Sequence, residues 1–255
     1  MKTLFFAELY KVLKNKLTYV AIGLATIPLI ISACFIYAKE SFSLGNGSSV
    51  PKINVFDYTI NISLGMIFQI FIYILFLVLY INSFISDEVK TDKILYQVVG
   101  SEHRKNTFIN KIMVTVFVSL VFLGLTMLSA YLGFELFIVD SEYFSNKNTF
   151  DSTQLFLLCF QFLYFICFMI FVACLSFVKK GNIVLIATFV VNLLSLNLAG
   201  KEKIALFIPG ALSYNSNLLS QGNIVGVGIF QVIYLVAITG VIAFMAYRNF
   251  QKREF

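Results

Sequence analysis

The stretch Phe84–Lys111, FISDEVKTDKILYQVVGSEHRKNTFINK, decides how the rest of this chain is interpreted. Acidic and basic residues crowd this stretch, whereas the sequences on either side are long and nearly free of charge. Each flank is long enough for a helix to cross the bilayer, which takes about 20 apolar residues. A polar segment between two such flanks is where a membrane protein can contact a soluble molecule.

Composition supports a membrane protein. Of the 255 residues, 59% are hydrophobic and only 13% are charged, whereas an ordinary soluble domain is about 25% charged. The continuous apolar runs predict an all-α integral membrane protein. The net charge of +6 fits basic residues flanking the membrane, because no basic run is dense enough to indicate a nucleic-acid partner.

The apolar runs predict six transmembrane helices in a single membrane domain that covers residues 1–255. The fifth is the shortest. The segment 201–222 has an apolar centre too short to cross, so we expect it to be re-entrant or interfacial. The six predicted spans are 17–38, 58–85, 112–134, 153–178, 182–199 and 224–247.

The segment 2–16 predicts an amphipathic helix that lies in the membrane interface, with lysines towards anionic headgroups. Its predicted polar face carries Glu8, Asn15 and the lysines, opposite the apolar residues. The residues expected at the interface are Phe5, Leu9, Lys11, Val12, Leu13 and Lys14.

Basic residues predict the orientation, because cytoplasmic loops carry the excess of Lys and Arg. With the N-terminus inside, 14 of the 19 lysines and arginines face the cytoplasm. An even number of spans then puts both termini in the cytoplasm of a multi-pass cell-membrane protein. The stretch Phe84–Lys111 is cytoplasmic in this arrangement.

The predicted span interiors contain no Asp, Glu, Lys, Arg or His. Ion-coupled transporters and intramembrane enzymes generally need ionisable groups at depth, so neither class fits. No catalytic dyad or metal site is evident. Five uncharged polar residues are candidates for a substrate path, although hydrogen bonds between helices are the commoner reason for such residues. They are Asn61, Gln69, Gln161, Asn192 and Gln231.

Two further patterns bear on packing and on energy supply. The spacing Ser129-x-x-x-Gly133 allows two helices to approach closely, although such matches are common. The phosphate-binding pattern GxxxxGK[ST] is absent from the sequence. Any energy for transport would therefore have to come from a partner, and only the stretch Phe84–Lys111 offers that partner a sizeable cytoplasmic surface.

Within that loop, the second span is expected to end near Ile85, and Ser86 is expected to cap a new, short helix. Gly100 would end this helix, which would lie across the cytoplasmic ends of the spans. A solvated connector without any such role explains the pattern equally well. The residues expected to couple the loop to a partner are Glu88, Val89, Lys93, Leu95, Val98 and Arg104.

The loop and the order of the predicted elements resemble the ABC-2-type permeases, the transmembrane subunits of one class of ABC transporter. In that family the first cytoplasmic loop commonly carries Glu, Arg and Lys at fixed distances, and Glu88, Arg104 and Lys111 stand at those positions. Asp92-Lys93 stands where the family has Gly-Thr, and Ser101 where Pro is common.

This resemblance implies a partner ATP-binding subunit that holds ATP and Mg, and a second permease copy, identical or different. It also implies that the loop helix docks into a groove on the ATPase. Small permeases of this kind often handle peptides, in immunity to antimicrobial peptides or in the export of amphipathic ones.

We therefore expect a permease subunit rather than an enzyme, one that exports amphipathic peptides or another hydrophobic substrate across the cell membrane. The alternative is a membrane scaffold or sensor that transports nothing and docks a soluble partner through the loop 86–106.

Overall fold

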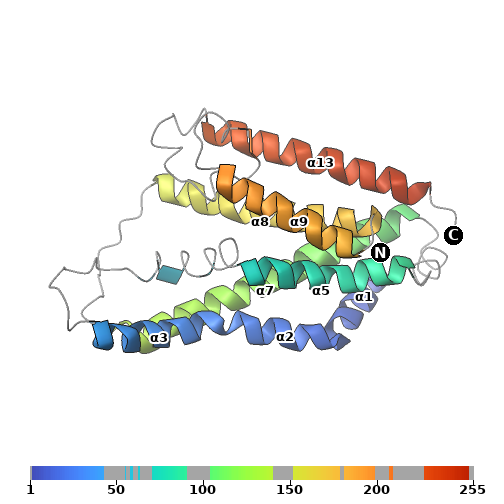
Figure 1. Ribbon diagram of the computed structural model, residues 1–255. Helices are drawn as coiled ribbons and strands as arrows, with labels where there is room; N and C mark the ends of the chain where they lie inside the picture. Colours follow the sequence, from blue (N-terminus) through green and yellow to red (C-terminus); the bar gives the residue numbers. More distant parts are fainter. Residues whose placement is uncertain are drawn as a thin grey trace.

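The structure is a computed structural model, and it describes residues 2–42, 55, 58–59, 63, 71–90, 104–139, 152–178, 181–198, 207–208 and 227–252. The regular structure of these residues is entirely helical. The helices are α1 (Lys2–Lys14), α2 (Lys16–Ala25), α3 (Ile27–Phe42), α5 (Phe71–Lys90), α7 (Arg104–Phe137), α8 (Ser152–Val178), α9 (Gly181–Leu198) and α13 (Ile229–Gln251) (Figure 1).

Four helical segments of the described chain are long and apolar enough to cross a membrane: Lys16–Cys34, Arg104–Phe137, Leu158–Val178 and Ile229–Gln251. They correspond to the first, third, fourth and sixth predicted spans. The second predicted span, 58–85, overlaps α5 only from residue 71 onwards, and the fifth, 182–199, coincides with α9; the described apolar cores of these two helices, Leu75–Ile85 and Ile183–Ser195, are shorter. The prediction of an all-helical membrane protein is thus confirmed in its coarse form, and six spans remain a prediction.

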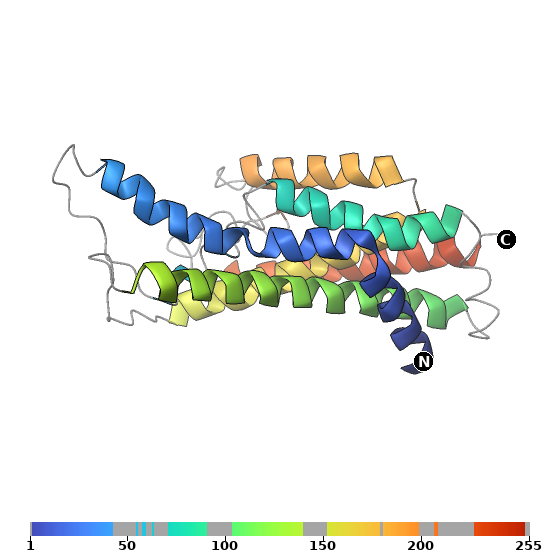
Figure 2. The same ribbon diagram turned by 90° about the horizontal axis from the view of Figure 1, so that it is seen from below.

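The long helices run in roughly the same direction (Figure 1). In the view of Figure 1, α13 lies above α8 and α9, and α2 and α3 form the lower edge. Helix α13 packs on α8, and α3 packs on α7. Figure 2 shows α1 turning away from the direction of α2, at the end of the molecule where α13 also ends.

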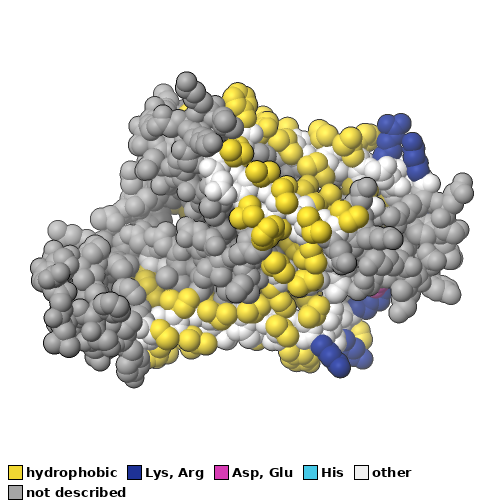
Figure 3. All heavy atoms as spheres, viewed as in Figure 1, with side chains coloured by type: hydrophobic (Ala, Val, Ile, Leu, Met, Phe, Trp, Pro, Cys, Tyr) yellow, Lys and Arg dark blue, Asp and Glu magenta, His cyan; other side chains and the backbone are white. Residues whose placement is uncertain are grey.

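The interior and the outer surface of this bundle are both apolar. Phe165 and Met169 of α8 are fully buried among neighbouring helices, whereas Phe244 and Ile233 of α13 are 64% and 63% exposed. Figure 3 shows apolar side chains over much of the visible face, with lysines and arginines gathered towards one end. A soluble monomer rarely exposes apolar patches on this scale, so the surface fits contact with lipid.

The first predicted span, expected as one helix over 17–38, is divided in two at Thr26. Pro28 lacks a backbone N–H, so it cannot continue the α-helical hydrogen bonding of the preceding turn. The backbone N–H of Thr26 instead donates to Gly23 O at 3.2 Å, as does its hydroxyl at 2.7 Å. Helix α3 begins immediately after this break.

The start of α3 packs against α7 at two small residues, Ser129 and Gly133, whose spacing in the sequence predicts a close helix contact. The backbone N–H of Leu29 donates to Ser129 Oγ at 3.2 Å. One turn along α7, Gly133 lies so close to α3 that a Cβ atom there would be 2.3 Å from Ser32 Oγ. The Ser129-x-x-x-Gly133 spacing is therefore confirmed as a close helix contact.

The predicted helix start at Ser86 is wrong, because α5 continues through Ser86 to Lys90. The predicted loop 86–106 is correspondingly shorter: its first residues belong to α5 and its last belong to α7. The segment 91–103 lies outside the described residues. So does the predicted re-entrant segment 201–222, except for Phe207 and Ile208.

Candidate functional site

Helix α7 is too long to lie wholly inside a bilayer. Its 34 residues extend over about 50 Å at 1.5 Å per residue, against a hydrocarbon core of roughly 30 Å. If the predicted span 112–134 occupies that core, the turns from Arg104 to Lys111 extend beyond it. These turns approach α1 and the end of α5, where the structure places a group of buried charges.

The centre of this group is Lys111, whose side chain is fully buried. Its Nζ donates to Glu8 Oε2 of α1 at 2.5 Å, to Phe84 O of α5 at 3.2 Å, and to Glu88 Oε2 of α5. An ammonium group has three protons to donate, and these three acceptors match that number. Each acceptor lies far from Lys111 in the sequence, so this one side chain joins α1, α5 and α7.

Lys11 is the solvent-exposed member of this group and pairs with both of its carboxylates. Its Nζ lies 2.8 Å from Glu8 Oε1 and 3.3 Å from Glu88 Oε1. Two carboxylates and two ammonium groups thus balance in charge, which offsets part of the cost of burying Glu8 and Lys111. We call Glu8, Lys11, Glu88 and Lys111 the ion cluster.

The pKa of Lys11 reflects this arrangement. Burial lowers it, but hydrogen bonds and charges of Glu8 and Glu88 outweigh burial and raise the pKa above its ordinary 10.5. A raised lysine pKa contributes stability that is complete below the unfolded-state value and is lost only as the pH rises through the folded-state value. Lys11 therefore remains protonated, and its contribution complete, throughout the physiological range.

The corner between α1 and α2 is held to α5 beside the ion cluster. Asn15 caps α2 by accepting from Leu17 N at 3.1 Å, and its Nδ2 donates to Ser83 Oγ at 3.0 Å. Thr18 Oγ1 donates to Val12 O at 2.5 Å and lies 2.9 Å from Tyr80 OH. These bonds fix the angle at which α1 leaves α2.

Arg104 lies at the same end of α7 but contacts a different helix. Its Nη1 donates to Gln251 O at 2.5 Å, and a cation at the carboxyl end of α13 is favourable to the helix dipole. Nearby, the ring of Phe108 packs against Phe177 of α8 and Phe250 of α13, with centroids 4.8 and 6.1 Å away. The start of α7 therefore joins α8 and α13 as well as α1 and α5.

The predicted coupling residues are only partly described. The structure brings Glu88 into the ion cluster and places Arg104 on α13, while Val89 belongs to α5. Lys93, Leu95 and Val98 lie outside the described residues.

The predicted interface residues of α1 do not share one environment. Phe5 and Leu9 are partly buried, Val12 is 2% exposed, and Lys11 belongs to the ion cluster, whereas Leu13 and Lys14 are exposed. Phe5 packs edge-on against Phe117 of α7, with centroids 5.9 Å apart. This part of the apolar face is therefore in contact with protein.

Glu8 is the residue that sequence reasoning misplaced. It was expected on a solvated polar face, yet its side chain is 3% exposed and lies on the side of α1 that also buries Val12. The reason is its partner: Lys111 makes burial of the carboxylate tolerable. The available signal was the position of Glu8, four residues before Val12, which puts the two on adjacent turns of one face.

The candidate substrate-path residues fall on three helices where they are described. Gln161 of α8 is partly buried, and Asn192 of α9 and Gln231 of α13 are buried. Asn61 and Gln69 lie outside the described residues. The described part of the chain contains no group of His, Cys, Asp or Glu that could hold a metal ion.

Comparisons with known proteins add no relative to this picture: no family model, no curated protein and no solved structure matches the chain.

Proposed function

We propose that this chain is the transmembrane permease subunit of an ATP-driven ABC exporter, and that the ion cluster receives movement from the loop that follows α5. The observation that carries the proposal is the pairing of Glu88 with Lys111. These residues stand on the two helices that flank the segment 91–103, so a force on that segment reaches both partners directly.

The resemblance in the sequence and the geometry support each other at this point. Glu88, Arg104 and Lys111 are the residues whose spacing resembles the ABC-2-type loop, and all three make contacts between helices. Through Glu8 the cluster includes α1, and through Arg104 the start of α7 contacts α13. Such connections suit a device that moves several spans together.

In this proposal a separate subunit binds ATP and Mg, and two permease copies form one transporter. The substrate is an amphipathic peptide or another hydrophobic molecule that leaves at the face of the cell membrane opposite the ion cluster. The basic ends of the helices then lie in the cytoplasm with both termini.

The first test is co-purification in mild detergent with an ATPase encoded beside this chain, followed by ATP hydrolysis in lipid vesicles with and without amphipathic peptides. We expect a stable complex whose hydrolysis the peptides stimulate. If the chain is instead a scaffold or sensor, a soluble partner will bind without ATP turnover that depends on the peptide.

The second test concerns the ion cluster itself. Glu88→Gln removes one charge of the pair, and a hydrogen bond to a charged group contributes about 1.5–3 kcal/mol, so we expect peptide-stimulated hydrolysis to fall about tenfold or more. Val98→Asp in the segment 91–103 should have the same effect with the cluster intact. The matched control is Glu135→Gln, which removes an exposed carboxylate at the opposite end of α7. Unchanged stimulation in both test variants would exclude a coupling role.

A further inference from the structure

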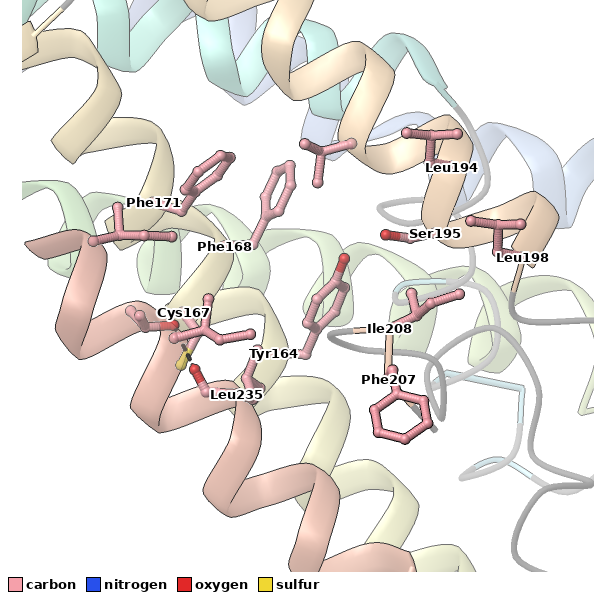
Figure 4. Close-up of a pocket in the computed structure, with 14 residues that line it drawn as sticks. Tyr164, Cys167, Phe168, Phe171, Leu194, Ser195, Leu198, Phe207, Ile208 and Leu235 are labelled. Carbon is pink, nitrogen blue, oxygen red and sulfur yellow. Dashed lines mark hydrogen bonds between the residues drawn. The ribbon is translucent and has the colours of Figure 1, made fainter. Parts of the chain in front are cut away.

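A cavity of about 360 Å³ lies between α8, α9 and α13 (Figure 4). Its floor includes Tyr164 and Phe168 of α8 and Leu235 of α13, each at most 5% exposed. Ser195 of α9 and Ile208 complete the wall nearest the floor. The volume falls in the range of about 300–1,000 Å³ that is typical of small-molecule sites.

The wall of the cavity offers little to a polar ligand. None of the described residues that line it carries a charged side chain. Thr239 donates its hydroxyl to Leu235 O at 2.8 Å and also bonds with the Cys167 thiol. Apart from the hydroxyl groups of Tyr164, Ser195 and Thr239, the described lining is apolar. A peptide backbone or a charged group placed here would lose most of its hydrogen bonds to water, which is costly. The cavity therefore selects for hydrocarbon.

The rim of the cavity shows where such a ligand enters. Leu194 is 52% exposed, Val191 37% and Phe207 63%, in contrast to the buried floor. The lining residues of α8 and α13 fall within the apolar segments Leu158–Val178 and Ile229–Gln251. At that depth the exposed rim faces the interior of the bilayer, whose molecules are acyl chains.

We propose that this cavity binds one acyl chain of a membrane phospholipid, which enters sideways between α9 and α13. A chain that leaves the bilayer gains no hydrophobic free energy, so its binding depends on close packing against the rings of Phe168, Phe171 and Phe207. The site requires only that the helices span the membrane, and it holds whether or not the chain works with an ATPase.

The chain has no tryptophan, so a single introduced tryptophan reports on its own surroundings without background. Phe168→Trp places the reporter on the cavity floor. Two controls bracket its response: Phe165→Trp lies on the same helix but is fully buried away from the cavity, and Phe244→Trp faces the outside at 64% exposed. Each variant is reconstituted in phosphatidylcholine with one acyl chain brominated at its middle, and in the same lipid without bromine.

Bromine quenches tryptophan only at close range. We expect the brominated lipid to quench Phe168→Trp about as strongly as Phe244→Trp and severalfold more than Phe165→Trp. Adding Ser195→Leu, which fills part of the cavity, should return the Phe168→Trp signal towards that of Phe165→Trp. If Phe168→Trp is quenched no more than Phe165→Trp, or if Ser195→Leu leaves its quenching unchanged, no acyl chain occupies the cavity.

A second reporter covers the case in which Phe168→Trp does not fold. Phe171→Trp lines the same cavity one turn along α8 and should show the same quenching and the same sensitivity to Ser195→Leu. A cavity filled by a peptide or by a second copy of the chain would leave this reporter shielded from the brominated lipid, which would overturn the proposal.

Discussion

Lys111 has its three ammonium protons directed at three acceptors, in a position without access to water. A buried ion pair gains little over an apolar pair of the same volume, but a buried charge that has lost its partner is strongly destabilising. The consequence is asymmetric: removing the cation is much more harmful than removing the cation and its carboxylate together.

We therefore predict that Lys111→Met lowers the free energy of unfolding by about 3–5 kcal/mol, because it leaves Glu8 buried with Lys11 as its only ion partner among the described residues. The double variant Lys111→Met with Glu8→Gln should recover much of this loss. Thermal unfolding of the purified protein in detergent measures both. The control is Lys105→Met, an exposed lysine on the same helix, which should change stability by less than about 0.5 kcal/mol. Equal losses in Lys111→Met and Lys105→Met would contradict the burial of the cluster.

The ion cluster also shows how far single residues could be predicted. Glu88 and Lys111 were identified by their spacing around one loop, because both belong to a local pattern. Glu8 was not, because its partner is 103 residues away and a helical wheel assigns every charge to water. An ion pair between residues that are distant in the sequence leaves no local pattern. The sequence therefore pointed to Glu88 and Lys111 but not to their pairing with Glu8.

Among the elements, α3 and α7 approach each other closely at Gly133. A Cβ at Gly133 would lie 2.7 Å from Ser32 Cβ and 3.2 Å from Leu29 Cα, and the latter atom is backbone that cannot rotate away. Ser32 is itself held, since it donates to Pro28 O and accepts from Tyr58 OH, both at 2.8 Å. The contact therefore has little room to adjust.

Gly133→Ala should consequently force α3 away from α7 and destabilise the protein by about 1–3 kcal/mol, the usual cost of overpacking. Gly124→Ala, two to three turns earlier on the same helix, is the matched control, because a Cβ there meets nothing within 4 Å. Alanine should be neutral at Gly124 or stabilise the helix by up to about 1 kcal/mol. The thermal unfolding midpoint of Gly133→Ala should thus fall, whereas that of Gly124→Ala should stay the same or rise. A Gly133→Ala protein as stable as Gly124→Ala would mean that the helices are not in contact.

Some helix boundaries could be predicted from the sequence and others could not. The extents of α8 and α9 follow the apolar runs to within a residue or two, because hydropathy alone determines them. The break before Pro28 could have been predicted, because proline inside a helix interrupts it. The predicted span 17–38 nevertheless continued across this position. The continuation of α5 past Ser86 was not readable from the local sequence, because the pairing of Glu88 with α1 and α7 supports that last turn.

At the scale of the whole molecule, the helix ends nearest the termini lie at one end of the bundle (Figure 1), where the lysines and arginines visible in Figure 3 also gather. An even number of crossings, as in the six predicted spans, would place both of these helix ends on the same side of the membrane. The side of the membrane on which this end lies follows from the positive-inside rule alone.

Labelling of single cysteines tests that orientation. In a variant whose four native cysteines are replaced by serine or alanine, a membrane-impermeant thiol reagent should reach Lys105→Cys and Lys252→Cys only from the cytoplasmic side. Glu135→Cys, at the far end of α7, should be labelled only from outside. Labelling of Lys105→Cys and Lys252→Cys from opposite sides would contradict the shared end, and labelling of both from outside would reverse the orientation.

The distance in sequence between Glu8 and Lys111 also has a consequence for how the protein is made. At about 5–20 residues per second, Lys111 is synthesised roughly 5–20 s after Glu8. During that interval the ion pair between Glu8 and Lys111 cannot form, because Lys111 does not yet exist. The carboxylate of Glu8 therefore stays at the surface of the membrane until α7 is present. Helix α1 is therefore synthesised before α7 but can be fixed only after α7 has been inserted, so this part of the protein assembles in an order different from that of translation.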